Sequence, residues 1–247
     1  MIDNTKLFNR KSDDYSQFRP AYPVAAADWL RSKVAGECAV DIGAGTGIFT
    51  RLLLACFKHV SAVEPNADMR REFFKNLPDV HCLISTGEAT SLPDSSVDLI
   101  TVAQAFHWLD EELFKKEALR ILRPAGKVAI IWNSSLKNDF TEARNRVCQK
   151  YCPRFRSGHA GKRSAAEGDE FLRTIYFRQV EVAVFNNPFV MDLRTYEGNI
   201  RSRSYALLPG EHDYEVFMAE IRNVFAEYSQ NGVVTEPQET QIYLGNF

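Results

Sequence analysis

Residues 40–50 read VDIGAGTGIFT, a strand pattern that ends near Asp41 and passes through three alternating glycines into a helical pattern. Glycine lets the backbone turn tightly and lets a ligand lie against it, and the start of the following helix offers unpaired N–H groups to an anion. The dinucleotide fingerprint GxGxxG would need a glycine at position 48, where this sequence has Ile48. The loop therefore indicates a ligand site whose spacing departs from the pattern of nicotinamide-dependent dehydrogenases.

An acidic residue, Glu64, stands at the end of the next apolar run, about 20 residues after Gly43. In doubly wound sheets an acidic side chain at this place accepts both hydroxyl groups of a ribose. The loop and Glu64 together therefore predict a ligand that carries a ribose.

Short apolar runs alternate with helical patterns between Cys38 and Val128, which is typical of βα units in a parallel sheet covered on both faces. The expected strands of this part are residues 38–43, 60–64, 80–85, 97–103 and 127–132, and the expected helices are 47–57, 66–77 and 110–124. A helical stretch at 140–151, an alternating strand at 177–185, a long helix that ends near Gly232 and a final strand at 240–247 follow. These patterns predict an α/β fold with a seven-stranded sheet.

The composition fits an ordinary folded domain. The chain has 247 residues with 30 Lys+Arg against 32 Asp+Glu, and 45% are apolar, which excludes wholesale disorder and gives no global argument for nucleic-acid binding. The five cysteines form no CxxC pair, so we expect free thiols in a reducing cytosol, with no disulfide framework and no metal site. Neither a leader peptide nor a run of about 18 apolar residues is present, so we expect a cytoplasmic protein without a membrane partner.

A local excess of positive charge lies between Thr141 and Arg178, where nine Lys and Arg face four acids. Such a segment could steer an anionic substrate or RNA toward the site. Most segments of this kind are simply solvated loops. The sequence from Arg154 to Glu170 is typical of an exposed loop, and no basic stretch is interleaved with stacking aromatics. A nucleic-acid partner is therefore not the one we expect, and RNA stays a minor alternative.

These motifs resemble those of class I S-adenosylmethionine-dependent methyltransferases of the type 11 family. Similar segments are residues 85–110, with the sequence STGEATSLPDSSVDLITVAQAFHWLD, and residues 117–133, with EALRILRPAGKVAIIWN. Residues 15–23, 105–108 and 240–247 resemble the branch that includes trans-aconitate methyltransferase-like proteins. The resemblance implies a three-layer Rossmann-like fold, a mostly parallel sheet with the last strand antiparallel, and S-adenosyl-L-methionine as cofactor with S-adenosyl-L-homocysteine as product.

The resemblance also implies roles for particular residues. The glycine loop would hold the methionine moiety, Glu64 the ribose, and other residues the adenine, the sulfonium end and a lid. The implied cofactor-binding residues are Asp41, Gly43, Ala44, Gly45, Thr46, Gly47, Glu64, Pro65, Met69, Gly87, Glu88, Ala89, Gln104, Ala105, Phe106, Tyr15 and Arg19. The candidate substrate residues are Tyr22, Trp108, Arg201, Arg203 and Tyr205, and the candidate catalytic residue is His107.

The expected organisation is a single methyltransferase domain over residues 1–247. Its parts are an N-terminal lid segment at 1–23, a cofactor-binding half at 24–133, a substrate-side cap and loop at 134–210, and a final helix and strand at 211–247. The expected partner is a small-molecule methyl acceptor, and the sequence carries no indication of oligomeric state.

The chemistry of the acceptor decides which residues are needed. A carboxylate is already an anion at neutral pH and needs only orientation, usually by arginines, whereas a hydroxyl, amine or carbon acceptor needs a base such as His107. Three other functions stay open at this point: a methyltransferase-fold protein that binds the cofactor without turnover, an RNA methyltransferase, and an NAD-dependent oxidoreductase.

Overall fold

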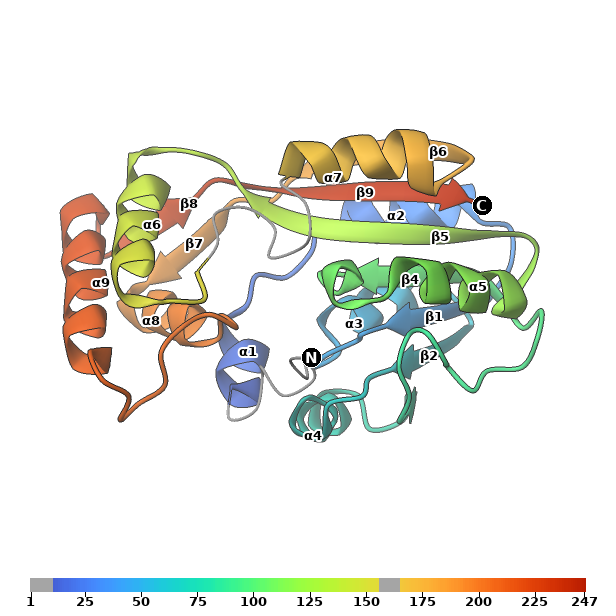
Figure 1. Ribbon diagram of the computed structural model, residues 1–247, viewed down its shortest axis with the longest axis horizontal. Helices are drawn as coiled ribbons and strands as arrows, with labels where there is room; N and C mark the ends of the chain where they lie inside the picture. Colours follow the sequence, from blue (N-terminus) through green and yellow to red (C-terminus); the bar gives the residue numbers. More distant parts are fainter. Residues whose placement is uncertain (1–10, 156–164) are drawn as a thin grey trace.

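The computed structural model describes residues 11–155 and 165–247. Its centre is a seven-stranded sheet in the order β3-β2-β1-β4-β5-β9-β6 (Figure 1). The strands are β1 (Cys38–Ile42), β2 (His59–Val63), β3 (His81–Leu83), β4 (Val97–Ala103), β5 (Leu122–Ser135), β6 (Gln179–Asn186) and β9 (Gln238–Asn246). The strand β9 runs antiparallel to both of its neighbours, and the pairs from β3 to β5 are parallel. The predicted fold class is confirmed.

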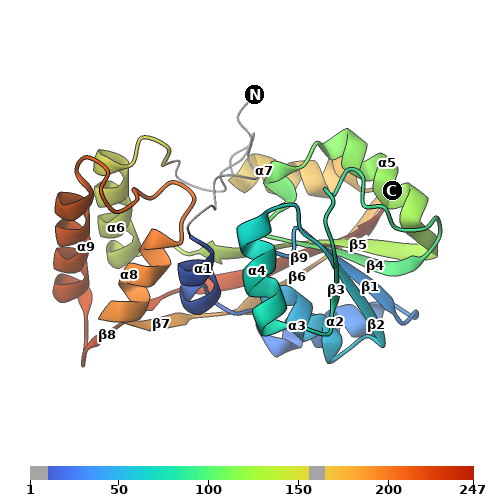
Figure 2. The same ribbon diagram turned by 90° about the horizontal axis from the view of Figure 1, so that it is seen from below.

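Helices cover both faces of this sheet, which gives three layers (Figure 2). One face is covered by α2 (Val24–Lys33), α3 (Ile48–Leu54) and α4 (Ala67–Asn76), and the other by α5 (Glu111–Ile121), α7 (Ala165–Phe171) and the π-helix η3 (Leu172–Tyr176). Side chains alternate across a strand, so neighbouring residues of β1 such as Ala39 and Val40 enter different cores. This double coverage explains why the central strands are almost continuously apolar.

A second lobe lies beyond one end of the sheet (Figure 1). It contains α6 (Asp139–Tyr151), α8 (Leu193–Arg201), α9 (Tyr214–Tyr228) and a two-stranded antiparallel sheet of β7 (Phe189–Asp192) and β8 (Val233–Glu236). The apolar faces of α6, α8 and α9 meet in one buried cluster that includes Tyr196 and Phe217. The expected boundary at 210 thus falls inside this lobe, with α6 and α8 before it and α9 and β8 after it. The strand β6 lies within the expected cap range of 134–210 but belongs to the main sheet.

The short helix α1 (Ser12–Phe18) lies between this lobe and the main sheet (Figure 2). On the lobe side, the ring of Phe18 packs directly on Gly198 of α8, and Lys11 Nζ donates to two carbonyl oxygens just beyond that helix, each at 2.7 Å. On the sheet side, Asn76 Nδ2 of α4 donates to Ser16 Oγ at 3.0 Å. The N-terminal segment is therefore fixed to both parts of the molecule. Among the helices of the described ranges, none is long and apolar enough to span a bilayer.

The packing of Phe18 on Gly198 is open to a direct test. A methyl group at position 198 would lie 2.1 Å from Cδ2 of Phe18, so the ring has to leave its site. We expect Gly198→Ala to lower the free energy of unfolding by about 1–3 kcal/mol and to speed proteolysis within residues 12–19. The control is Gly168→Ala in α7, where a Cβ meets nothing within 4 Å. Equal protection of both variants from protease would contradict this role of Gly198.

Candidate functional site

The glycine loop connects β1 to α3 with a left-handed backbone at three residues. The φ angles of Gly43, Gly45 and Gly47 are +67°, +58° and +87°. A Cβ atom at Gly43 would lie 2.6 Å from Cβ of Ala105, and one at Gly47 would lie 2.7 Å from Cδ1 of Leu77. Both space and backbone conformation therefore require glycine at these two positions.

Asp41 stands at the base of this loop and is 1% exposed. Its carboxylate accepts hydrogen bonds from the hydroxyl groups of Thr50 at 2.6 Å and Thr101 at 2.8 Å. Burial raises the pKa of Asp41 to about 6, the two hydroxyl donors act in the opposite direction, and the nearby charge of Glu64 adds to the rise. The site thus holds a carboxylate whose charge depends on pH close to neutrality.

Glu64 follows β2 and is buried beside the same loop. Its two carboxylate oxygens accept from the backbone N–H groups of Gly45 at 2.8 Å and Asn66 at 2.7 Å. Burial raises the pKa of Glu64, and the two amide donors oppose this rise. Each oxygen keeps a further lone pair, so the carboxylate can still accept from a pair of hydroxyl groups.

A pocket opens next to the loop and is continuous with solvent. Many of its walls come from residues that the sequence analysis singled out: Tyr15, Arg19, Tyr22, Asp41, Gly43, Ala44 and Gln104. The remaining walls were not expected: Pro20, Ile48, Phe49, Ala103 and Asn133. The structure therefore brings the N-terminal segment, the glycine loop and the end of β4 to one cavity.

Asn133 is the most connected of the unexpected residues. Its backbone oxygen accepts from Gln104 Nε2 at 2.8 Å, its Oδ1 accepts from Thr240 Oγ1 at 2.5 Å, and its Nδ2 donates to the Ala21 carbonyl at 3.3 Å. The same carbonyl accepts from Asn187 Nδ2 at 2.9 Å. These bonds fix the stretch from Pro20 to Tyr22 over the end of the sheet. In the sequence, the signal that could have indicated this role of Asn133 is its position directly after the predicted strand at 127–132.

Several expected cofactor residues lie outside this pocket lining. Glu88 Oε1 accepts from the backbone N–H of Asp110 just before α5, at 2.9 Å, and Gly87 and Ala89 flank it. Met69 is buried in the first turn of α4, with its N–H bonded to Asn66, and Pro65 precedes that turn. Other expected residues are in the core or the loop: Ala105 and Phe106 are buried after β4, and Thr46 is buried within the glycine loop.

His107 and Trp108 lie in a short 3₁₀ turn, η2 (Phe106–Trp108), after β4. The His107 ring stacks on Trp132 with a centroid distance of 5.3 Å and lies 4.3 Å from Trp108. Neither residue is part of the pocket wall. The two share an aromatic cluster on the edge of the sheet that also carries the glycine loop.

The expected substrate arginines have different environments. Arg201 forms a two-point ion pair with Asp14 of α1, with distances of 2.9 and 3.1 Å, and thus joins α8 to α1. Arg203 donates to Asn199 Oδ1 at 3.0 Å. The ring of Tyr205 meets Phe155 edge to face. Of the predicted substrate residues, Tyr22 lines the pocket, with its ring edge to face on Phe49 at 5.0 Å.

The basic segment between Thr141 and Arg178 is only partly within the described ranges, because residues 156–164 lie outside them. So do residues 1–10 of the expected lid. Several cations of the basic segment that lie within the described ranges have acidic partners: Arg144 with Glu236, Lys150 with Glu220, and Arg173 with Asp169. For these three residues the charge is compensated within the protein.

The strand order, the reversed β9, the glycine loop after β1 and the acid after β2 agree with the fold that the sequence resemblance implies. The sequence agrees, because residues 40–130 match a family model described as a methyltransferase domain. These residues, which run from β1 into β5, are therefore similar to a methyltransferase domain over less than half of the chain.

Curated relatives that are named as methyltransferases match part of this chain. An uncharacterized methyltransferase of Mycobacterium tuberculosis is 40% identical over 132 residues, which are 53% of this chain and 54% of that protein. An uncharacterized methyltransferase-like protein of Schizosaccharomyces pombe is 37% identical over 133 residues, 52% of each chain. A malonyl-[acyl-carrier protein] O-methyltransferase of Methylococcus capsulatus is 37% identical over 98 residues, 36% of this chain and 35% of that protein. The chain thus spans about half the length of the first two relatives, and less of the third.

Solved structures match over a longer range and show the fold. A candidate type II methyltransferase from Anaeromyxobacter dehalogenans has a TM-score of 0.70 at 23% identity and covers 93% of this chain and 98% of that chain. The YcgJ protein from Bacillus subtilis has a TM-score of 0.55 at 16% identity, covering 91% and 98%. The finer resemblance to the trans-aconitate methyltransferase-like branch stays a prediction.

The raised pKa of Asp41 predicts how stability depends on pH. The pKa is about 6 in the folded protein against 3.8 for the free group, so the folded state binds more protons between these values. The free energy of unfolding therefore falls as the pH rises from 4 to 6, by an amount on the order of 3 kcal/mol for this group. We expect Asp41→Asn to flatten this part of the profile in urea titrations at a series of pH values. An unchanged slope in the variant would show that Asp41 is not the group responsible.

Proposed function

We propose that this protein is an S-adenosylmethionine-dependent methyltransferase that acts on a small molecule bearing a carboxylate. The observation that carries the proposal is the contact of the Glu64 carboxylate with the N–H of Gly45, at 2.8 Å, in the glycine loop that also contributes Gly43 and Ala44 to the pocket wall. This contact presents two acceptor oxygens to a ribose beside a backbone that has room for a ligand.

The residues present fit this cofactor. Close approach to the backbone is possible at Gly45, where an added Cβ would lie 3.9 Å from Tyr15, the nearest neighbouring side chain. Within the described ranges, the buried hydroxyl of Thr46 in this loop has no hydrogen-bond partner, so a polar ligand group could supply one. Asp41 offers a buried carboxylate to an ammonium group, and Arg19 a guanidinium to a carboxylate.

Each part of the site has a distinct role in this proposal. The cofactor, when bound, supplies a methyl group on a sulfonium, which the acceptor's lone pair takes as the C–S bond electrons return to sulfur. The chain itself contributes alignment and exclusion of water, since transfer to an anion needs no proton removal. Tyr15 and Arg19 would cover the cofactor, Gln104 would line its sulfonium end, Tyr22 would orient the acceptor, and Glu88 with Pro65 and Met69 would contact the adenine.

A carboxylate is the acceptor that this site suits best. The candidate base, His107, packs against Trp108 and Trp132 and does not line the pocket, so it is not placed to take a proton from an acceptor there. The Methylococcus capsulatus relative is named as an O-methyltransferase, which supports oxygen as the receiving atom. Transfer to a carboxylate oxygen would leave a neutral ester.

Cofactor binding tests the proposal first. We expect saturable binding of S-adenosylhomocysteine in calorimetry, and a loss of about 10–100-fold in affinity for Glu64→Gln, because the amide carries no charge and turns a donor toward the ribose or a backbone N–H. Glu72→Gln on α4 is the matched control, since Glu72 pairs with Lys75 outside the pocket. A folded protein that binds neither this ligand nor S-adenosylmethionine, but binds NADH, would refute the assignment.

The role of His107 separates the carboxylate acceptor from the others. We expect His107→Gln to keep methyl transfer from labelled cofactor within about tenfold of the unchanged protein, whereas loss of a general base lowers a rate by about 100-fold or more. The measurement is label incorporation into a metabolite extract across pH 6–9. A large loss that is restored at high pH would instead favour a hydroxyl or amine acceptor.

A further inference from the structure

Two side-chain amides, those of Asn133 and Gln104, belong to the pocket wall where β5 and β4 end. An amide carries both a donor and an acceptor, so its orientation decides which of the two a ligand meets. For both residues, hydrogen bonds within the protein settle that orientation.

The carbonyl of Ala21 fixes the amide of Asn133, because a carbonyl oxygen can only accept. It accepts from Asn133 Nδ2 at 3.3 Å and from Asn187 Nδ2 at 2.9 Å. The same Asn187 Nδ2 lies 3.3 Å from Asn133 Oδ1, and Thr240 Oγ1 donates to this oxygen at 2.5 Å. Exchanging the nitrogen and oxygen of Asn133 would therefore place two oxygens together at Ala21 and two nitrogens together at Asn187.

These bonds use the acceptor side of the Asn133 amide and leave part of its donor side. Oδ1 takes two donors, whereas Nδ2 has two hydrogens and one partner, the Ala21 carbonyl, within residues 11–155 and 165–247. Asn133 is half-buried and lies in the pocket wall, so its second N–H is available to a ligand. The Asn133 amide thus offers a ligand a neutral donor and no acceptor.

Gln104 is fixed in the opposite sense. Its Nε2 donates to the backbone oxygen of Asn133 at 2.8 Å, so its carbonyl oxygen is left for a ligand. A carbonyl oxygen suits a positive group such as the sulfonium, which is the end of the cofactor that Gln104 would line. The N–H of Asn133 suits a ligand oxygen instead.

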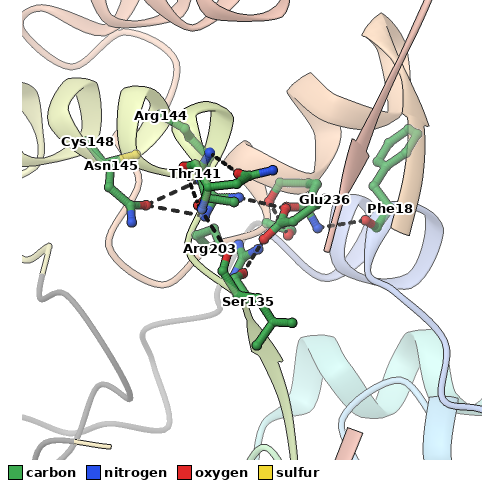
Figure 3. A network of polar contacts seen from close by, with 12 residues as sticks. Phe18, Ser135, Thr141, Arg144, Asn145, Cys148, Arg203 and Glu236 are labelled. Atoms are coloured by element: carbon green, nitrogen blue, oxygen red, sulfur yellow. Dashed lines mark hydrogen bonds and ion pairs between the residues drawn. The ribbon is translucent and has the colours of Figure 1, made fainter. Parts of the chain in front are cut away.

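The end of β5 that carries Asn133 is also held from the side of the second lobe (Figure 3). Ser135 Oγ donates to the carboxylate of Glu236, which pairs with Arg144 of α6 at 2.6 Å between Oε2 and Nη1. Burial acts to raise the pKa of Glu236, but the charge of Arg144 outweighs it and the pKa is lowered to about 2. This ion pair stays charged at neutral pH, so the strand end and the Asn133 amide are held in place before a ligand arrives.

A neutral donor is well matched to a carboxylate acceptor. A carboxylate loses its negative charge as it becomes an ester, so a cation against it would stabilise the reactant more than the transition state. A neutral N–H on the oxygen that does not react keeps its hydrogen bond, since that oxygen becomes the ester carbonyl, and it turns the other oxygen toward the methyl group.

We propose that Asn133 is a specificity-determining residue: its amide N–H binds the oxygen of the acceptor carboxylate that does not receive the methyl group. Thr240 and Asn187 are positioning residues that hold this amide with its donor toward the pocket. The inference rests on the proposed function and names the group that would recognise the acceptor.

Acetate and methylammonium are the probes for this role, because the first offers only acceptors and the second only donors. Each is titrated into the protein saturated with S-adenosylhomocysteine and followed by NMR of the protein amides. We expect the unchanged protein to bind acetate saturably. Asn133→Leu, which is similar in size but has no donor, lowers the acetate affinity by at least about tenfold, as for a hydrogen bond to a charged group, and keeps the S-adenosylhomocysteine affinity within about threefold.

Asn133→Asp keeps the shape of the side chain and replaces the donor by an acceptor with negative charge. We expect this variant to bind methylammonium more tightly than acetate, which reverses the preference of the unchanged protein. Disturbance of the wall alone would weaken both probes alike and would reverse nothing.

The matched control is Asn187→Ala. It removes the second donor to the same Ala21 carbonyl and one donor to Asn133 Oδ1, whereas Asn187 is not part of the pocket wall. It keeps the acetate affinity within about threefold, because Thr240 and Ala21 still hold the Asn133 amide.

Three results overturn the inference: acetate that does not saturate the unchanged protein, equal losses of acetate affinity in Asn133→Leu and Asn187→Ala, or an Asn133→Asp variant that still prefers acetate. Equal losses would mean that the network only holds the wall in place. A folded protein that binds no S-adenosylhomocysteine overturns the proposed function itself, whereas the three results above count against the role of Asn133 while cofactor binding stands.

Discussion

The backbone turn between β1 and α3 is the constraint on which the site depends. The chain has to reverse direction at the carboxyl edge of the sheet while Ala105 approaches to within 2.6 Å of where a Cβ of residue 43 would be. Only a loop of glycines in left-handed conformation satisfies both conditions. Because of this turn, the N–H of Gly45 meets Glu64 at the end of β2, and Asp41 is enclosed by Thr50 and Thr101. Two buried carboxylates and an open backbone surface thus share one edge of the sheet.

The second lobe completes the site through α1. Asp14, Phe18 and Arg19 of the N-terminal segment contact α8 or the turn after it, and Ser16 contacts α4 on the main domain. The segment that forms one wall of the pocket is thus positioned by residues nearly two hundred positions further along the chain. Substitutions in α8, far from the glycine loop in sequence, should therefore alter ligand binding through α1.

The sequence predicted the main sheet well because its signals are local and repeated. The apolar runs of β1, β2 and β4, the alternation in β6 and the glycine loop are visible without knowledge of the fold, and all seven strands of the sheet overlap the expected ranges. The expected helix at 110–124 was too long, because α5 ends at Ile121 and β5 begins at Leu122. The two-stranded sheet of β7 and β8 was missed, because its strands have four residues each, Val190 is exposed, and the two segments lie far apart in the sequence.

The side-chain environment of single residues was less predictable. Arg201 and Arg203 lie two positions apart in the same segment and look alike in sequence, yet one is paired with Asp14 and the other has a buried donor without a partner in the described part of the chain. Asn133 connects Gln104, Thr240 and Ala21, which meet only after the sheet has assembled. Such contacts are decided by tertiary structure, and a sequence pattern contains no record of them.

A crystal structure with S-adenosylhomocysteine tests the account most directly. The account predicts that both ribose hydroxyl groups lie within hydrogen-bond distance of the Glu64 carboxylate and that the homocysteine part lies along Gly43 to Gly45 under Tyr15 and Arg19. A ligand bound elsewhere, or a ribose held by residues other than Glu64, would contradict it.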